Sequence, residues 1–164
     1  MTLQLNRRFF MATGAAALTL PALAPLARAQ AAAVVEMLSR DSDGNRNVFS
    51  PRLVAIKAGE TVLFQATDRN HDSASINGMI PAGAASWDGD LHTDISVTFD
   101  QPGVYGYKCS PHLRQGMVGV VLVQGPGMTD NLADADAAGA DQGGRAADAF
   151  AEIFAEARAA GMLG

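Results

Sequence analysis

Between residues 34 and 123 the sequence consists of short apolar runs separated by turns rich in glycine, proline and aspartate. Residues 95–99 alternate apolar and polar side chains with a period of two, which is typical of a half-buried strand. Further strands are expected at 34–38, 49–57, 61–66, 104–109 and 117–123. Because several short strands at this spacing usually form two packed sheets, the pattern predicts an all-β sandwich.

Residues 126–164 differ in composition, since they are rich in Ala and Asp and contain no β-type run. Four apolar residues there recur at helical spacing, namely Phe150, Ile153, Phe154 and Ala157. A shorter helix is expected to start near Asp130 and Asn131, with a break at 141–144. We therefore predict a β-sandwich domain at 30–125 and a C-terminal helical extension at 126–164 that packs on it.

Residues 1–29 have the features of a cleaved export signal. Two arginines at positions 7 and 8 precede an apolar, Ala-rich run, and Ala27-Arg28-Ala29 supplies the small-x-small pattern of a signal-peptidase site. The paired arginines followed by two Phe resemble the twin-arginine type of signal, and a general secretory signal is the alternative. Pro21 and Pro25 argue against a third interpretation, an uncleaved membrane anchor. We expect the mature protein in the periplasm.

The charge of the chain excludes one large class of partners. Residues 1–29 carry three arginines and no acid, so residues 30–164 hold a net charge of −8, against −5 for the whole chain. A strongly acidic protein is a poor electrostatic partner for nucleic acid. After residue 30 the sequence has no apolar stretch long enough to span a bilayer, so we expect no membrane association once the signal is removed.

Three residues with metal-binding side chains lie close together between two predicted strands. Cys109, His112 and Met117 form the pattern C-x2-H-x4-M, and a loop between adjacent strands can bring all three to one point. A fourth ligand would come from a distant loop. His71 is the candidate, because it follows the predicted strand at 61–66 within a polar turn.

A thiolate, two neutral imidazoles and a thioether together are the ligand set of blue-copper electron-transfer sites. The sulfur and nitrogen ligands accommodate both Cu(I) and Cu(II), and zinc gains little from a thioether. Each residue also has an ordinary interpretation, since Met117 and Cys109 could be core residues and His112 a surface residue. Their combination in an exported protein favours one copper ion per chain. We interpret His92 as a surface residue. The alternative is that His92, rather than His71, is the fourth ligand.

The residues around this motif resemble the pseudoazurins, type 1 copper proteins of the cupredoxin family. The matching segments are Gln-Pro-Gly-Val-Tyr at 101–105, Lys-Cys-Ser-Pro-His at 108–112, Gly116-Met117, Met-Ile-Pro-Ala-Gly-Ala at 79–84 and Val-Glu-Met-Leu at 35–38. A tail of two helices is specific to pseudoazurins among small cupredoxins.

This resemblance implies a Greek-key sandwich and a monomeric periplasmic electron carrier, not an enzyme. It implies four copper ligands, which are His71, Cys109, His112 and Met117. It also implies transient docking at the His112 face with a redox partner such as a copper nitrite reductase. Arg40, Arg69 and Lys108 match basic positions around that face, and Arg114 adds a charge. The alternative is that these four residues are ordinary solvated charges with no role in docking.

The sequence departs from the family at Asp72, where Asn is typical, and at Leu113 and Gln115 near the docking face. A carboxylate beside copper favours Cu(II) and lowers the reduction potential.

Copper delivery and copper-dependent oxidation are the two alternative functions. A copper-delivery protein usually carries exposed Met and His clusters, whereas Met residues are scattered here. A copper oxidase would need more than the three histidines of this chain.

Overall fold

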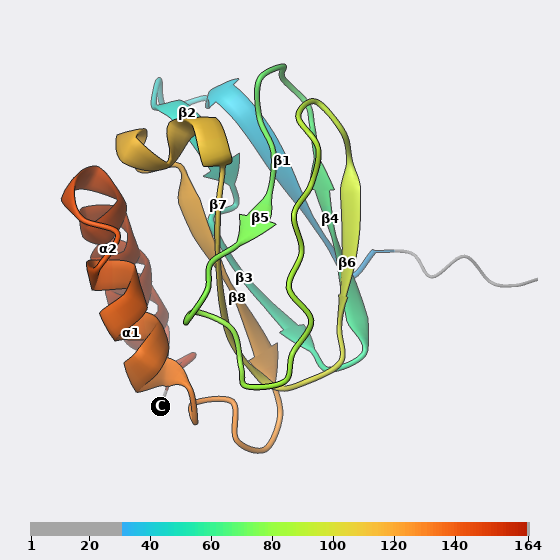
Figure 1. Cartoon of the computed structure of the whole chain (residues 1–164), viewed down its shortest axis with the longest axis vertical. Helices are drawn as coiled ribbons and strands as arrows, with labels where there is room; N and C mark the ends of the chain where they lie inside the picture. Colours follow the sequence, from blue (N-terminus) through green and yellow to red (C-terminus); the bar gives the residue numbers. More distant parts are fainter. Residues whose placement is uncertain (1–30, 164) are drawn as a thin grey trace, which may run out of the picture.

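The computed structural model describes residues 31–163, so the expected export signal lies outside the described residues. The elements follow in the order β1 (Ala33–Arg40), β2 (Arg46–Ser50), β3 (Leu53–Lys57), β4 (Glu60–Gln65), β5 (Ala74–Ser75), β6 (Ile95–Phe99), β7 (Gly103–Lys108), the 3-10 helix η1 (Ser110–Gln115), β8 (Val118–Gln124), α1 (Leu132–Ala140) and α2 (Gly144–Ala159). Figure 1 shows the strands as two facing layers, with both helices on one side.

The strands form two four-stranded sheets in the orders β2-β1-β4-β6 and β3-β8-β7-β5. Each sheet contains one parallel pair, β1 with β4 and β3 with β8, and antiparallel pairs elsewhere. Non-consecutive neighbours of this kind require the chain to cross between the sheets. The predicted all-β sandwich with two C-terminal helices is confirmed.

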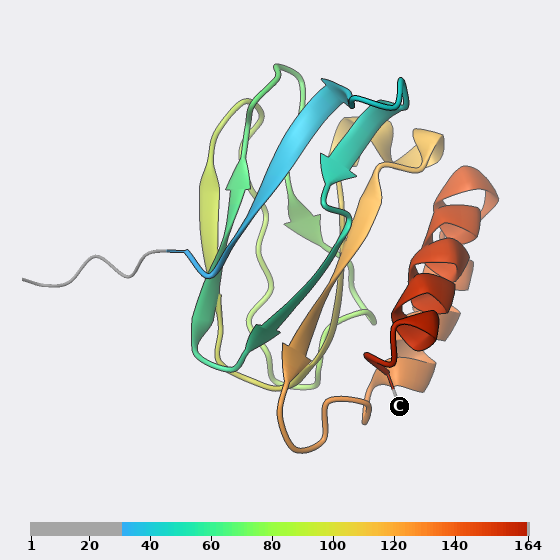
Figure 2. The same cartoon turned by 180° about the vertical axis from the view of Figure 1, so that it is seen from behind.

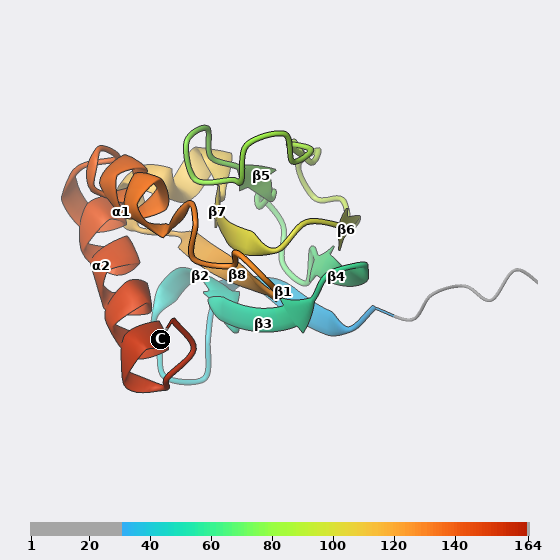
Figure 3. The same ribbon diagram turned by 90° about the horizontal axis from the view of Figure 1, so that it is seen from below.

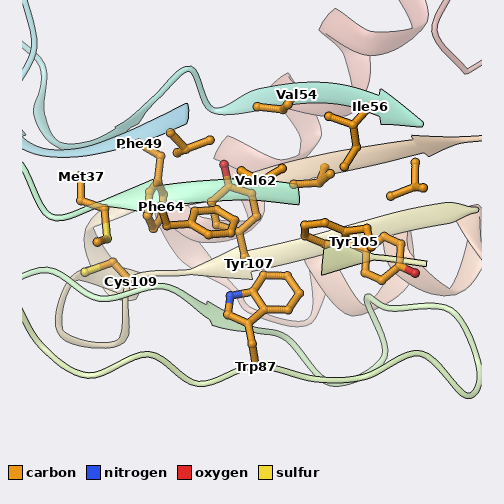
Figure 4. Packing of buried hydrophobic residues seen from close by; sticks show 14 of the residues in the cluster. Met37, Phe49, Val54, Ile56, Val62, Phe64, Trp87, Tyr105, Tyr107 and Cys109 are labelled. Carbon is orange, nitrogen blue, oxygen red and sulfur yellow. The ribbon is translucent and has the colours of Figure 1, made fainter. Parts of the chain in front are cut away.

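An aromatic cluster fills the space between the sheets (Figure 4). The Tyr107 ring contacts Phe49 and Phe64 edge to face, with centroids 4.8 and 4.9 Å apart. Gly119 makes room for that ring, because a β-carbon on Gly119 would lie 2.3 Å from the Tyr107 hydroxyl. Cys109 belongs to the same buried cluster, so the aromatic core supports one end of the predicted metal site.

The two helices cover the outer face of the β3-β8-β7-β5 sheet (Figures 2 and 3). The apolar face of α2 is buried there, in one cluster with residues of β7 and β8. β8 is therefore buried on both faces, as its apolar sequence indicates. At the start of α1 the Asn131 side chain both accepts from the Val104 N–H and donates to the Val104 carbonyl, at 2.9 and 2.8 Å. This pairing fixes the helical extension to the start of β7.

The prediction of one strand at 49–57 is wrong. The segment contains two strands in different sheets, since β2 pairs with β1 and β3 pairs with β8. Pro51 lies between them and has no N–H to continue a ladder. The chain changes sheet at this proline.

Residues 73–92 are mostly loop, as expected, and hold only the two-residue β5 among regular elements. Neither helix of the described residues has the length and apolarity to cross a membrane.

Candidate metal centre

The connection between β7 and β8 is a tight loop closed by its own backbone hydrogen bonds. The Cys109 N–H donates to the Met117 carbonyl at 3.0 Å, so these two residues face each other across the base of the loop. The Met117 N–H in turn donates to the His112 carbonyl at 3.3 Å. Gly116 closes the turn in the left-handed conformation, with φ of 88°. The C-x2-H-x4-M spacing therefore corresponds to one compact loop at one end of the sandwich.

His71 reaches the same end of the sandwich on the loop that follows β4. The Asp68 N–H donates to the Met37 carbonyl at 3.0 Å, which holds this loop against β1. The neighbouring Asp72 carboxylate accepts a hydrogen bond from the Ser110 N–H at 2.6 Å. That bond joins the loop of His71 to the loop of Cys109.

These loops place one thiol and two imidazoles together. The Cys109 Sγ lies 3.7 Å from His71 Nδ1 and 3.4 Å from His112 Nδ1. The three ligand atoms all lie within 4.8 Å of one another. His71 and Cys109 are fully buried, and His112 is partly exposed. The cluster thus has two ligands inside the protein and one at its surface.

The separations suit a single metal ion. Bonds of about 2.3 Å to sulfur and about 2.0 Å to nitrogen, meeting at about 120°, place those ligand atoms about 3.7 Å apart. Both sulfur-to-nitrogen distances are close to this value. Met117 is 1% exposed and is buried in the same cluster as Cys109, so a thioether is available beside the three strong ligands. One thiolate, two imidazoles and a thioether suit copper better than zinc.

Burial controls the protonation of the cluster without metal. Burial, together with electrostatic coupling to the neighbouring His112 ring, lowers the pKa of the His71 imidazole, which favours the neutral form that binds metal. Burial raises the pKa of the Cys109 thiol to about 11, and repulsion from the Asp72 carboxylate acts in the same direction. A metal ion must therefore displace the thiol proton when it binds.

The second ring nitrogen of His71 is also engaged. His71 Nε2 lies 3.1 Å from the Ser39 hydroxyl at the end of β1. A hydrogen bond at this nitrogen leaves Nδ1 free as the metal ligand and fixes the plane of the ring. Ser39 gave no signal in the sequence, because its contact with His71 spans 32 positions.

Comparison with known proteins agrees with this geometry. Residues 35–124 match the family model described as copper binding proteins, plastocyanin/azurin family. The pseudoazurin of Methylorubrum extorquens is 39% identical over 114 residues, which is 70% of this chain and 77% of that protein. The chain belongs to the pseudoazurin branch of this copper-binding family.

Solved pseudoazurin structures have the same fold. The structure from Sinorhizobium meliloti has a TM-score of 0.69 at 39% identity. The match covers 76% of this chain and 94% of the chain in that structure. The structure from Methylobacterium extorquens AM1 has a TM-score of 0.69 at 35% identity and covers 76% of this chain and 97% of its own. Copper is the cofactor of this family, and pseudoazurins are electron carriers rather than enzymes.

His92, the remaining histidine, lies outside the three-ligand cluster. Its side chain is exposed, as expected of a surface residue. The described residues contain no other cluster of His, Cys, Asp or Glu ligand atoms at this spacing. His92 nevertheless contacts the loop of His71, a contact that the sequence did not indicate.

Proposed function

We propose that the chain is a periplasmic electron carrier whose copper ligands are His71, Cys109, His112 and Met117. The observation that carries the proposal is the cluster of one buried thiol and two imidazoles, of which only His112 reaches the surface among the described residues. Bound copper supplies one-electron exchange between Cu(I) and Cu(II). The protein provides a fixed ligand set in a largely buried site and one ligand edge open to a partner.

The buried surroundings favour a carrier function. Cys109 and Met117 are held by the backbone bonds of one loop, and His71 is held by Ser39 at its far nitrogen. Ligands constrained in this way move little when the charge of the ion changes by one. A small reorganisation makes electron transfer fast, and a buried site excludes competing ligands such as water.

His112 is the proposed exit for the electron. Its ring is partly exposed, and its neighbours at the surface are Pro111, Leu113 and Gly116. The side chains of Pro111 and Leu113 carry no groups that bind water tightly, and Gly116 has no side chain. A partner can therefore cover this surface and leave it again at little cost in desolvation. An apolar patch made of these few residues suits a transient complex with a small interface, typical of redox encounters.

Charge steers the proposed encounter. Arg69 and Arg114 are exposed on the ligand loops, whereas residues 30–164 as a whole have a net charge of −8. A local basic rim on an acidic protein orients the His112 face toward an acidic surface of the partner. We propose a denitrification reductase, such as copper nitrite reductase, as the partner class that the family resemblance implies.

Electron transfer between the copper-loaded protein and a copper nitrite reductase tests this proposal by stopped flow. Arg114→Glu is expected to lower the association rate constant at low salt and to weaken its dependence on ionic strength. The matched control is Lys57→Glu, which reverses an exposed charge at the far end of β3. Equal effects of the two variants would exclude docking at the His112 face, and absence of transfer would exclude this partner class.

Copper delivery is less well supported. Met37, Met79 and Met117 are buried, and Met162 is the one methionine among the exposed large apolar residues of the described structure, so these residues form no cluster of exposed methionines for passing Cu(I) to a target. No observation in the described residues favours this function over electron transfer.

A further inference from the structure

His92 makes two hydrogen bonds to consecutive residues of the loop that carries His71. Its ring Nδ1 accepts from the Asn70 N–H at 2.6 Å. Its own N–H donates to the His71 carbonyl at 2.9 Å. The side chain and the backbone of one exposed residue therefore hold the Asn70 N–H and the His71 carbonyl, which belong to the peptide groups on either side of the one that joins Asn70 to His71. We call this pair of bonds the 70–92 clasp.

We propose that His92 is a positioning residue, which keeps His71 in place through the 70–92 clasp. The inference deepens the proposed copper function and rests on it. His92 contributes no ligand atom to the three-ligand cluster. Its role is to restrict the backbone from which the buried imidazole projects.

The loop needs such a restraint because it lies outside the sheets. β4 ends at Gln65 and β5 begins only at Ala74, so no strand ladder holds His71. Bonds from Asp68 to Met37 and from Gly89 to Ser73 hold the two ends of the loop. The 70–92 clasp acts between these ends, at the ligand itself.

The backbone conformation supports the same conclusion. Asn70 and His92 both adopt the left-handed conformation, with φ of 70° and 64°. This conformation is uncommon for residues with a β-carbon, although Asn and His adopt it more readily than most. Two such residues bonded to each other beside a metal ligand indicate that the surrounding structure holds the loop in one unusual shape.

Two substitutions at position 92 separate the ring acceptor from the backbone conformation. His92→Asn keeps an acceptor, because Asn Oδ1 occupies the same position along the side chain as His Nδ1, and Asn also tolerates positive φ. His92→Gly tolerates the conformation equally well but removes the acceptor. Leu91→Gly, at an exposed neighbouring position, is the control for adding a glycine to this segment.

The measurements are amide hydrogen exchange at Asn70 in the metal-free protein and the rate of copper release to a chelator from the loaded protein. We expect His92→Gly to accelerate Asn70 exchange about tenfold and copper release by about two- to tenfold, the range for one lost hydrogen bond. His92→Asn and Leu91→Gly should match the unsubstituted protein in both measurements.

Unchanged Asn70 exchange in His92→Gly would overturn the proposal, because the ring acceptor would then be dispensable. Exchange and release as fast in His92→Asn as in His92→Gly would overturn it as well. If the unsubstituted protein binds no copper, the proposed function fails, while the metal-free exchange measurement still decides whether the 70–92 clasp exists.

Discussion

Replacing Asp72 by Asn should raise the reduction potential of the bound copper. Asp72 is 5% exposed, and its Oδ1 accepts from the Ser110 N–H at 2.6 Å, one residue after Cys109. The amide oxygen of Asn can accept the same hydrogen bond, so the connection between the two ligand loops is retained. The substitution therefore removes one negative charge with little change of shape.

The expected magnitude follows from Coulomb's law. For a unit charge at an assumed separation of about 7 Å, in an effective dielectric constant of about 20, the interaction energy is about 2.4 kcal/mol. An energy of about 2.3 kcal/mol corresponds to roughly 100 mV for one electron. Because the Asp72 carboxylate stabilises Cu(II) more than Cu(I), its removal should raise the potential by about 100 mV.

A spectroelectrochemical titration of the copper-loaded variants measures this shift. Asp94→Asn is the matched control, since the Asp94 Oδ1 also accepts a backbone N–H, from Ala66 at 2.8 Å, but Asp94 is exposed. Its shift should be much smaller because solvent and salt screen an exposed charge. If both variants shift the potential equally, or Asp72→Asn leaves it unchanged with the optical spectrum intact, the electrostatic reasoning is wrong.

Three further predictions concern the metal site and the helical extension. Ser39→Ala removes the partner of His71 Nε2 and should weaken copper binding about tenfold in a chelator competition, whereas an unchanged affinity would contradict the contact. Because the pKa of the Cys109 thiol is raised to about 11, copper must displace its proton between pH 7 and 9. The apparent affinity should then rise about tenfold per pH unit, and a flat profile would refute this. Phe150→Ala should lower the free energy of unfolding by about 3–5 kcal/mol in a denaturant titration, against about 0.5 kcal/mol or less for the exposed Asp148→Ala.

Local patterns predicted most of the regular elements. The alternation at 95–99 and the apolar face of α2 each depend on spacing within one segment, and the structure retains both. The strand predicted at 49–57 failed because the change of sheet at Pro51 depends on pairing with β1 and β8, which no local pattern contains. Asn131 was expected at a helix start, but its bonds to Val104 depend on where β7 lies.

The metal site was predictable to the extent that its ligands are close in sequence. Cys109, His112 and Met117 lie on one loop, so their spacing alone indicated a common centre. The choice of His71 over His92 as the distant ligand depended on its position just after a predicted strand. The structure places His71 beside the Cys109 thiol. The contact between Ser39 and His71 and the 70–92 clasp join distant segments through common residue types, so only the folded chain reveals them.

Titration of the mature protein with Cu(II), followed by visible absorption and electron paramagnetic resonance, tests the central claim most directly. We predict one copper per chain and an intense blue thiolate-to-copper band that is lost in Cys109→Ser and His71→Ala. A colourless protein would contradict the account, as would a band that persists in His71→Ala and disappears in His92→Ala.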